Sequence, residues 1–226
     1  MSHFRLAVNE NFFKIWSPEM AYVLGYFTAD GYMFINSGGS YYIAFVSTDY
    51  DLISKVREML YSRQKISSRK YKNRKGKIIY RLQIGSKKLF RDLLDFGLIP
   101  NKSKKIKLPK IPKSYFRHFV RGYFDGDGCV DFGFYRKRGK KKATLMTKFY
   151  SSNKTFLQDL WQILKRYAQV KGGSLYKRER KFDLSLSVRD SFRLYNFMYK
   201  GVKKNQFLER KYNEFQQAIN YYAGVA

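Results

Sequence analysis

The sequence contains few cysteines and histidines, the residues that commonly form disulfides in secreted domains and bind metals. Its 226 residues include one cysteine, Cys129, and two histidines, His3 and His118. A single cysteine excludes an intrachain disulfide and a cysteine-rich zinc site, and two histidines make a histidine-based metal site a poor fit. Any bound metal must therefore be held by oxygen ligands.

Acidic residues and long apolar runs are also scarce. Asp and Glu number 17 against 46 Lys and Arg, which gives a formal net charge of +29. This charge exceeds what solubility requires and favours a polyanionic partner. No apolar run approaches the ~18 residues of a membrane span, and no secretion signal is recognisable. The sequence predicts an intracellular protein, in the cytoplasm, nucleoid or an organelle, that binds nucleic acid and no membrane.

Prolines number only four, and three of them lie between Leu98 and Ser114, among lysines and without any acid. Their spacing prevents a helix, and the positive charge suits a path close to phosphates. We interpret residues 98–114 as a basic linker between an N-terminal half, 1–97, and a C-terminal half, 115–226.

The two halves repeat one order of predicted elements. Each opens with a helix after a capping serine, Ser17 or Ser114, and the same number of residues leads from that serine to Asp30 or Asp127. A hairpin, a helix, a second hairpin and a short helix follow, which predicts an α+β fold. The expected helices cover 50–62 and 155–167, the returning strands 79–84 and 182–188, and a C-terminal helix 205–222.

Small residues lie four apart in both opening helices. Gly25 and Ala29 form such a pair in the first helix, and Gly122 and Gly126 form one in the second. Residues at this spacing share one helix face, and small side chains let two backbones approach closely. We therefore expect the two helices to pack through these faces.

Such packing would bring together Asp30 and Asp127, which end the two helices. Carboxylates at the negative ends of two helix dipoles repel unless a cation lies between them. Mg²⁺ accepts carboxylates, waters and phosphate oxygens as ligands, so we predict that both aspartates bind Mg²⁺ and are catalytic. We expect Mn²⁺ to substitute for Mg²⁺, and Ca²⁺ to support binding of the nucleic acid without its cleavage. The alternative is that each is a solvated acid at a helix end.

The residues around both aspartates resemble a known family. VLGYFTADG (23–31) and VRGYFDGDG (120–128) are similar to the two motifs of a LAGLIDADG homing endonuclease of the two-motif, single-chain type. Thr28 departs from the pattern, because an acid is usual there, whereas the metal-binding acid is present in both copies. The repeat and the linker extend the resemblance over almost the whole chain.

This resemblance implies two pseudo-symmetric αββαββα halves whose curved antiparallel sheets form a DNA-binding saddle. It implies a site-specific endonuclease that cleaves double-stranded DNA across the minor groove and leaves 3′ overhangs. Two motifs in one chain imply a monomer with a target that need not be palindromic. The scaffold also allows an intron RNA-splicing maturase or a non-catalytic DNA-binding regulator.

Further catalytic groups follow from the same resemblance. The segment 97–103 looks like the family's lysine-bearing segment, which makes Lys102 the candidate lysine. Asp49 and Asn153 occupy places where a residue that positions water is expected, although either could be a helix cap. The lysine of the second half stays open between Lys204 and Lys211.

Strand alternation predicts the DNA-reading residues. Arg81 and Gln83 alternate with apolar residues in one strand, and Ser185 and Ser187 do so in another. These side chains should meet base edges, and basic residues of the turns should bind phosphates. The predicted DNA contacts are Arg69, Lys70, Lys72, Arg74, Lys77, Arg81, Gln83, Arg136, Arg138, Lys140, Lys148, Lys177, Arg178, Arg180, Ser185 and Ser187.

Overall fold

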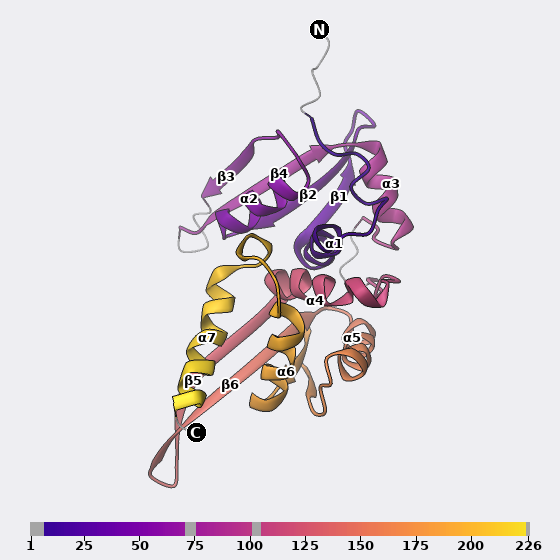
Figure 1. The fold of residues 1–226 in the computed structure, drawn as a ribbon. Coiled ribbons are helices and arrows are strands. Elements are labelled where there is room, and N and C mark those ends of the chain that lie inside the picture. The colour runs from indigo at the N-terminus through magenta and orange to yellow at the C-terminus, as the bar shows by residue number, and fades with distance from the viewer. Residues whose placement is uncertain (1–6, 71–75, 101–104, 225–226) are drawn as a thin grey trace. The chain divides into compact units, whose positions relative to one another are not determined.

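The computed structural model describes residues 7–70, 76–100 and 105–224, which form two compact units (Figure 1). Unit 1 covers Met1–Gly126 and unit 2 covers Asp127–Ala226. Each unit has one four-stranded antiparallel sheet in its described part. The fold class is α+β, as the sequence predicts.

Unit 1 contains the first repeat and one further helix. Its strands lie in the order β1-β2-β4-β3. The elements are α1 (Pro18–Asp30), β1 (Gly31–Ile35), β2 (Tyr41–Ser47), α2 (Tyr50–Met59), β3 (Ile66–Lys70), β4 (Ile78–Gly85), α3 (Lys87–Asp95) and α4 (Lys113–Asp127), whose last residue belongs to unit 2.

Side chains that alternate along the strands of the first sheet place apolar residues in the core of unit 1. Phe45 pairs with Leu82 and Ile43 with Ile84, so these four side chains share one face, and all are fully buried. Phe27 of α1 meets the Phe45 ring edge-on at 5.2 Å. The opposite face of the sheet is therefore left for polar and aromatic side chains.

Unit 2 repeats the strand order, β5-β6-β8-β7, which confirms the predicted repeat. Its elements are β5 (Gly128–Lys137), β6 (Lys140–Ser151), α5 (Lys154–Tyr167), β7 (Ser174–Lys177), β8 (Phe182–Leu186), α6 (Val188–Tyr199), the 3-10 helix η3 (Lys204–Gln206) and α7 (Glu209–Gly224).

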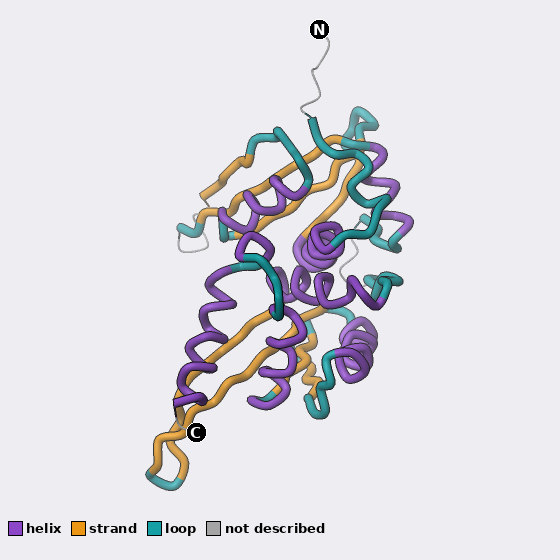
Figure 2. The backbone as a smooth tube through the Cα atoms, in the orientation of Figure 1, coloured by secondary structure: helices purple, strands orange, loops and turns teal. Residues whose placement is uncertain are grey.

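The C-terminal helix α7 lies along strand β5 (Figure 2). Tyr221 of α7 contacts the rings of Phe132 and Phe134, with centroids 5.7 and 5.2 Å apart. These two strand residues share the face opposite the one that carries Lys148 and Ser185. The helix therefore covers apolar strand surface that the sequence left without an assigned partner.

Several predicted boundaries shift in the structure. Ser17 caps α1 as predicted, accepting a hydrogen bond from the Met20 amide at 3.0 Å. Ser114 was wrongly predicted as a cap, because α4 begins at Lys113 after a turn in which the Tyr115 amide donates to the Pro112 carbonyl. Helix α2 ends at Met59 rather than residue 62, since Tyr61 adopts the left-handed conformation (φ 50°).

Candidate active site and nucleic-acid interface

Helices α1 and α4 touch through their backbones in unit 1. A Cβ placed on Gly25 would lie 2.1 Å from the carbonyl oxygen of Phe119, and one on Gly122 would lie 1.9 Å from that of Tyr22. No side chain fits at such distances, so both positions require glycine. The predicted packing of the small-residue faces is confirmed at these two residues.

Asp30 ends α1 beside the end of α4. Its Oδ2 lies 3.3 Å from where a Cβ of Gly126 would be, and Ala29 lies even nearer to that point, at 2.5 Å. Gly126 directly precedes Asp127, which is the last residue of α4. Both aspartates are half-buried, and neither helix has a basic residue in its last turn. Each carboxylate therefore ends a helix at the negative end of its dipole.

Asp125 is a structural residue of the same helix contact. It is 2% exposed, and its Oδ2 accepts a hydrogen bond of 2.7 Å from the hydroxyl of Tyr22 on α1. Thr28 occupies the corresponding position in the first motif and donates to the Leu24 carbonyl within its own helix at 2.7 Å. An acid at this position thus ties α4 to α1, whereas threonine is satisfied locally.

Tyr26 connects α1 to the first sheet beneath Asp30. Its hydroxyl donates to the Val46 carbonyl oxygen at 2.6 Å. Burial raises the pKa of Tyr26 well above its ordinary value, and the negative charge of Asp30 raises it further. The phenol therefore stays protonated and keeps this hydrogen bond.

Lys211 of α7 lies at the start of strand β5 in unit 2. Its side chain is almost completely buried, and Nζ donates to the carbonyl oxygen of Gly128 at 2.7 Å. Gly128 directly follows Asp127 in the chain. Lys204, the other open alternative, is exposed on η3. The two lysines that the sequence left as alternatives therefore differ in burial, since Lys211 is buried and Lys204 is exposed.

Asp49 and Asn153 both stand at helix N-cap positions. The Asn153 side chain accepts from the Phe156 amide at 3.2 Å and so caps α5. Asp49 precedes α2 without a side-chain cap hydrogen bond, although its own amide donates to Ser47 Oγ at 3.0 Å. Lys102 lies outside the described residues.

Two aspartates fit a magnesium site by their chemistry. Mg²⁺ is usually held by one or two carboxylates together with waters and substrate phosphates. In the described part of the chain no group of three or more His, Cys, Asp or Glu residues could hold a metal. A magnesium ion held by the two aspartates would take its remaining ligands from waters and phosphate oxygens.

The first sheet presents predicted base-reading residues on the face away from the core. Arg81 and Gln83 alternate with the buried Leu82 and Ile84, and Arg69 of β3 shares their face. The Arg81 Nη1 donates to the Tyr32 hydroxyl at 3.4 Å. Lys70 alternates to the other face but is exposed at the sheet edge.

The second sheet carries Lys148 and Ser185 as a direct pair on its face away from the helices. Ser187 was wrongly predicted as a strand residue, because β8 ends at Leu186 and Ser187 is the N-cap of α6. It still lines the same hollow as Ser185. Lys177 pairs with Phe182 and alternates to the other face, where it is exposed.

The remaining predicted phosphate contacts lie in or beside hairpin turns. They are exposed side chains, as phosphate binding requires. They comprise Lys77 before β4, Arg136, Arg138 and Lys140 around the β5–β6 turn, and Arg178 and Arg180 after β7. Lys72 and Arg74 lie outside the described residues.

One polar residue of the second sheet escaped the sequence analysis. Asp183 is 1% exposed and accepts a hydrogen bond of 2.8 Å from Arg178 Nε. It alternates with Ser185 along β8, so the same period-two pattern that selected the serine would have placed Asp183 on the polar face. Its position beside a basic turn was the available signal.

Comparison with protein families supports the two-repeat reading. The family model of the LAGLIDADG-like domain matches residues 17–96 and 114–190, more than half of the chain. The chain belongs to this family. Both LAGLIDADG matches include a helix that ends in a motif aspartate, Asp30 or Asp127. No curated protein matches the sequence.

Solved LAGLIDADG structures share the fold at low sequence identity. Similar ones include the meganuclease I-AabMI bound to uncleaved DNA (12% identity, TM-score 0.58, 92% of each chain covered). The meganuclease I-CpaMI bound to uncleaved DNA has 13% identity and a TM-score of 0.60, with 93% of each chain covered. The homing endonuclease I-WcaI bound to its DNA recognition sequence has 15% identity and a TM-score of 0.59, covering 91% of this chain and 90% of that one.

Membrane insertion through a helix finds no support in the part of the chain that the structure describes. None of the helices there is long and apolar enough to cross a bilayer.

Proposed function

We propose that this LAGLIDADG protein is a site-specific endonuclease that hydrolyses both strands of double-stranded DNA across the minor groove and leaves 3′ overhangs. The observation that carries the proposal is the contact of α1 with α4 through Gly25 and Gly122, with Asp30 beside Gly126. The related structures I-AabMI, I-CpaMI and I-WcaI are bound to DNA, which supports the same substrate class.

Asp30 and Asp127 would hold divalent metal, with Mg²⁺ as the expected ion and Mn²⁺ as a substitute. A bound divalent ion supplies Lewis-acid chemistry at a phosphate and lowers the pKa of bound water. The helix dipoles disfavour negative charge at these two helix ends, and a divalent cation bound by both carboxylates would offset that cost. Ca²⁺ should support DNA binding without cleavage.

The protein's own side chains would position the DNA around these carboxylates. The polar faces of the two sheets would read base edges, and the exposed cations of the turns would bind phosphates. Asp49 and Asn153, at the N-cap positions of α2 and α5, are our candidates for orienting a water.

A single chain with two motifs would act as a monomer on a target that need not be palindromic. Both motif helices are present in unit 1 and pack on each other there, so no second copy is needed to supply the helix contact. Its substrate also leads us to propose an intracellular location.

The test uses Asp30→Asn and Asp127→Asn, which keep shape and remove one charge each. Substrate is supercoiled plasmid that carries the sequence flanking the chain's own gene, incubated with Mg²⁺. Cleavage should fall about 10³-fold or more in either variant, because the metal supplies several kcal/mol of transition-state stabilisation. Binding to the same DNA in Ca²⁺ should survive.

Asp159→Asn is the matched control, since Asp159 is an exposed acid on α5. It should cut like the wild type. Wild-type cleavage by Asp30→Asn or Asp127→Asn would remove that residue from the active site. A wild-type protein that binds the plasmid but never cuts it would instead favour a DNA-binding regulator, and intron RNA splicing would favour a maturase.

A further inference from the structure

Arg178 and Asp183 form an ion pair on the polar face of the second sheet. We define this polar face by Lys148, Tyr176, Asp183 and Ser185, which pair across β6, β7 and β8 or alternate by two along a strand. Arg178 directly follows β7, and its Nε donates to Oδ2 of Asp183 at 2.8 Å. The pair therefore joins a basic turn to the face that we propose meets DNA.

The partners of this ion pair differ sharply in exposure. The Asp183 side chain is 2% exposed, whereas that of Arg178 is 52% exposed. The second carboxylate oxygen, Oδ1, is also buried, and no described residue donates a hydrogen bond to it. Because a buried carboxylate is strongly destabilising without a cationic partner, Asp183 should hold Arg178 in one orientation.

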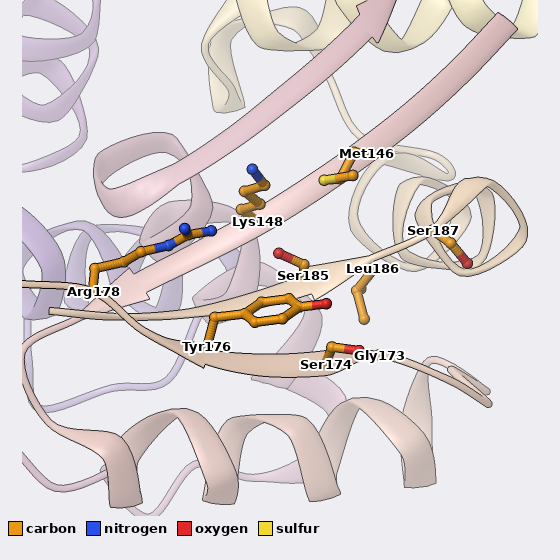
Figure 3. Close-up of a pocket in the computed structure, with 9 residues that line it drawn as sticks. All are labelled: Met146, Lys148, Gly173, Ser174, Tyr176, Arg178, Ser185, Leu186 and Ser187. Carbon is orange, nitrogen blue, oxygen red and sulfur yellow. The ribbon is translucent and has the colours of Figure 1, made fainter. Parts of the chain in front are cut away.

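A second contact fixes the guanidinium from another direction. Its central carbon lies 5.6 Å from the centre of the Tyr176 ring, within the range of a cation–π interaction. Figure 3 shows the guanidinium reaching from the end of β7 toward Lys148, with Tyr176 and Ser185 on the same side. These residues border a hollow of about 380 Å³ that is open to solvent.

We infer that Arg178 reads a guanine in the major groove of the target and that Asp183 is the positioning residue that aims it. Arginine has five N–H donors, and Nε is used by Asp183, which leaves the Nη1 and Nη2 groups for the guanine O6 and N7. Lys148 and Ser185 lie beside it to contact the neighbouring base pair. The inference rests on the proposed function, because it names one base of the same target.

Arg180 provides an internal contrast in the same turn. It pairs with the adjacent Glu179 at 3.6 Å, and both side chains are about nine-tenths exposed (90% and 87%). A loosely held arginine suits a phosphate, whose contact adds affinity without base preference. Two arginines separated by one residue thus differ in how firmly they are oriented, and only Arg178 should specify a base.

The test is selection from a randomised duplex DNA library in Ca²⁺ by the full-length wild type, Arg178→Lys, Asp183→Asn and Arg180→Lys. Lysine keeps the charge and loses the planar fork. The wild type should prefer guanine at one position by about tenfold or more, and Arg178→Lys should lose that preference. Asp183→Asn should weaken it while the rest of the site is still selected. Arg180→Lys should keep it, because lysine retains the positive charge that a phosphate contact uses.

The outcomes separate this inference from the proposed function. An unchanged guanine preference in Arg178→Lys, or an equal loss of affinity for every sequence, would show that Arg178 does not read a base. A wild type that selects no sequence would overturn site-specific recognition, and this inference with it. Circular dichroism and melting of each variant establish folding, and Arg178→Lys decides the matter even if Asp183→Asn does not fold.

Discussion

Lys211 donates a hydrogen bond to the carbonyl oxygen of Gly128, the residue that follows the motif aspartate Asp127. The donor comes from the C-terminal helix α7 and the acceptor from the first residue of β5. A buried ammonium that forms such a bond fixes the backbone next to the aspartate. The C-terminal helix therefore contributes to the position of Asp127 and Gly128 within unit 2.

We predict that Lys211→Met destabilises the protein by about 1.5–3 kcal/mol, the range for a lost hydrogen bond to a charged group. Methionine keeps much of the length of the lysine stem and removes the donor. Lys204→Met is the control, because Lys204 is exposed. Urea unfolding measures both. Equal stability of the two variants would contradict a structural role for Lys211.

Gly122→Ala should destabilise unit 1 by about 1–3 kcal/mol or more, the usual cost of overpacking. The added methyl group would lie 1.9 Å from the Tyr22 carbonyl oxygen, which belongs to a rigid helix backbone. Gly224→Ala is the control at the end of α7, where nothing lies within 4 Å of the new Cβ. That control should be neutral or slightly stabilising, because alanine favours helix. Thermal unfolding distinguishes the two.

Stability should depend on pH through His118. Burial, together with the positive charges of Arg121 and Arg117, lowers the pKa of His118 from 6.5 to about 4. The unfolded chain takes up this proton below about pH 6.5, and the folded chain does so only near pH 4. The contribution of neutral His118 to the free energy of unfolding should therefore be fully present above pH 6.5 and be lost as the pH drops toward 4.

The size of this loss should be about 1–2 kcal/mol, because solvent screens a side chain that is only half-buried. His118→Gln keeps an acceptor for the Arg121 guanidinium, which lies 3.0 Å from His118 Nδ1, and it does not titrate. Unfolding of this variant and the wild type should be compared between pH 4 and 7. Parallel curves would show that His118 does not cause the dependence.

DNA binding should weaken steeply with salt. With a net charge of +29 and exposed cations in the turns, the protein should displace condensed counterions from the DNA. If about six or more phosphates are contacted, affinity should fall about 10³-fold or more between roughly 50 and 200 mM salt. Fluorescence anisotropy with a labelled duplex measures this slope. A flat slope would remove the electrostatic basis of binding.

The sequence predicted the repeated architecture because its signals are local and occur twice. Gly39 and Gly139, with φ of 76° and 75°, occupy the turns of the first hairpin in each repeat. Gly25 and Gly122 likewise lie at the helix contact that their spacing predicted. Positive φ and close backbone approach both demand glycine, so these residues report directly on structure.

Other features depend on packing that a local pattern does not encode. Ser114 has the residue type of a cap, but α4 starts one residue earlier at Lys113. Ser187 continues the alternation of β8, yet it precedes a helix instead. The partner of α7 emerges only from the contact of Tyr221 with Phe132 and Phe134, residues far away in the sequence.

For the same reason, the boundaries of the sequence repeats differ from those of the compact units. By sequence, α4 opens the second repeat, which we placed at 115–226 after a linker at 98–114. By packing, α4 belongs almost entirely to unit 1, because its backbone meets α1 at Gly25 and Gly122. A repeat in the sequence and a unit of packing are thus different divisions of one chain.

That contact has a consequence for how such proteins can be recombined. A crossover in the linker would join an α1 from one parent to an α4 from another, and any side chain in place of Gly25 or Gly122 would separate the pair. A crossover just after Asp127 would instead inherit both helices together and exchange unit 2, including the sheet face that we propose reads bases. New target half-sites should therefore be acquired more readily by exchange at the end of α4 than by exchange in the linker.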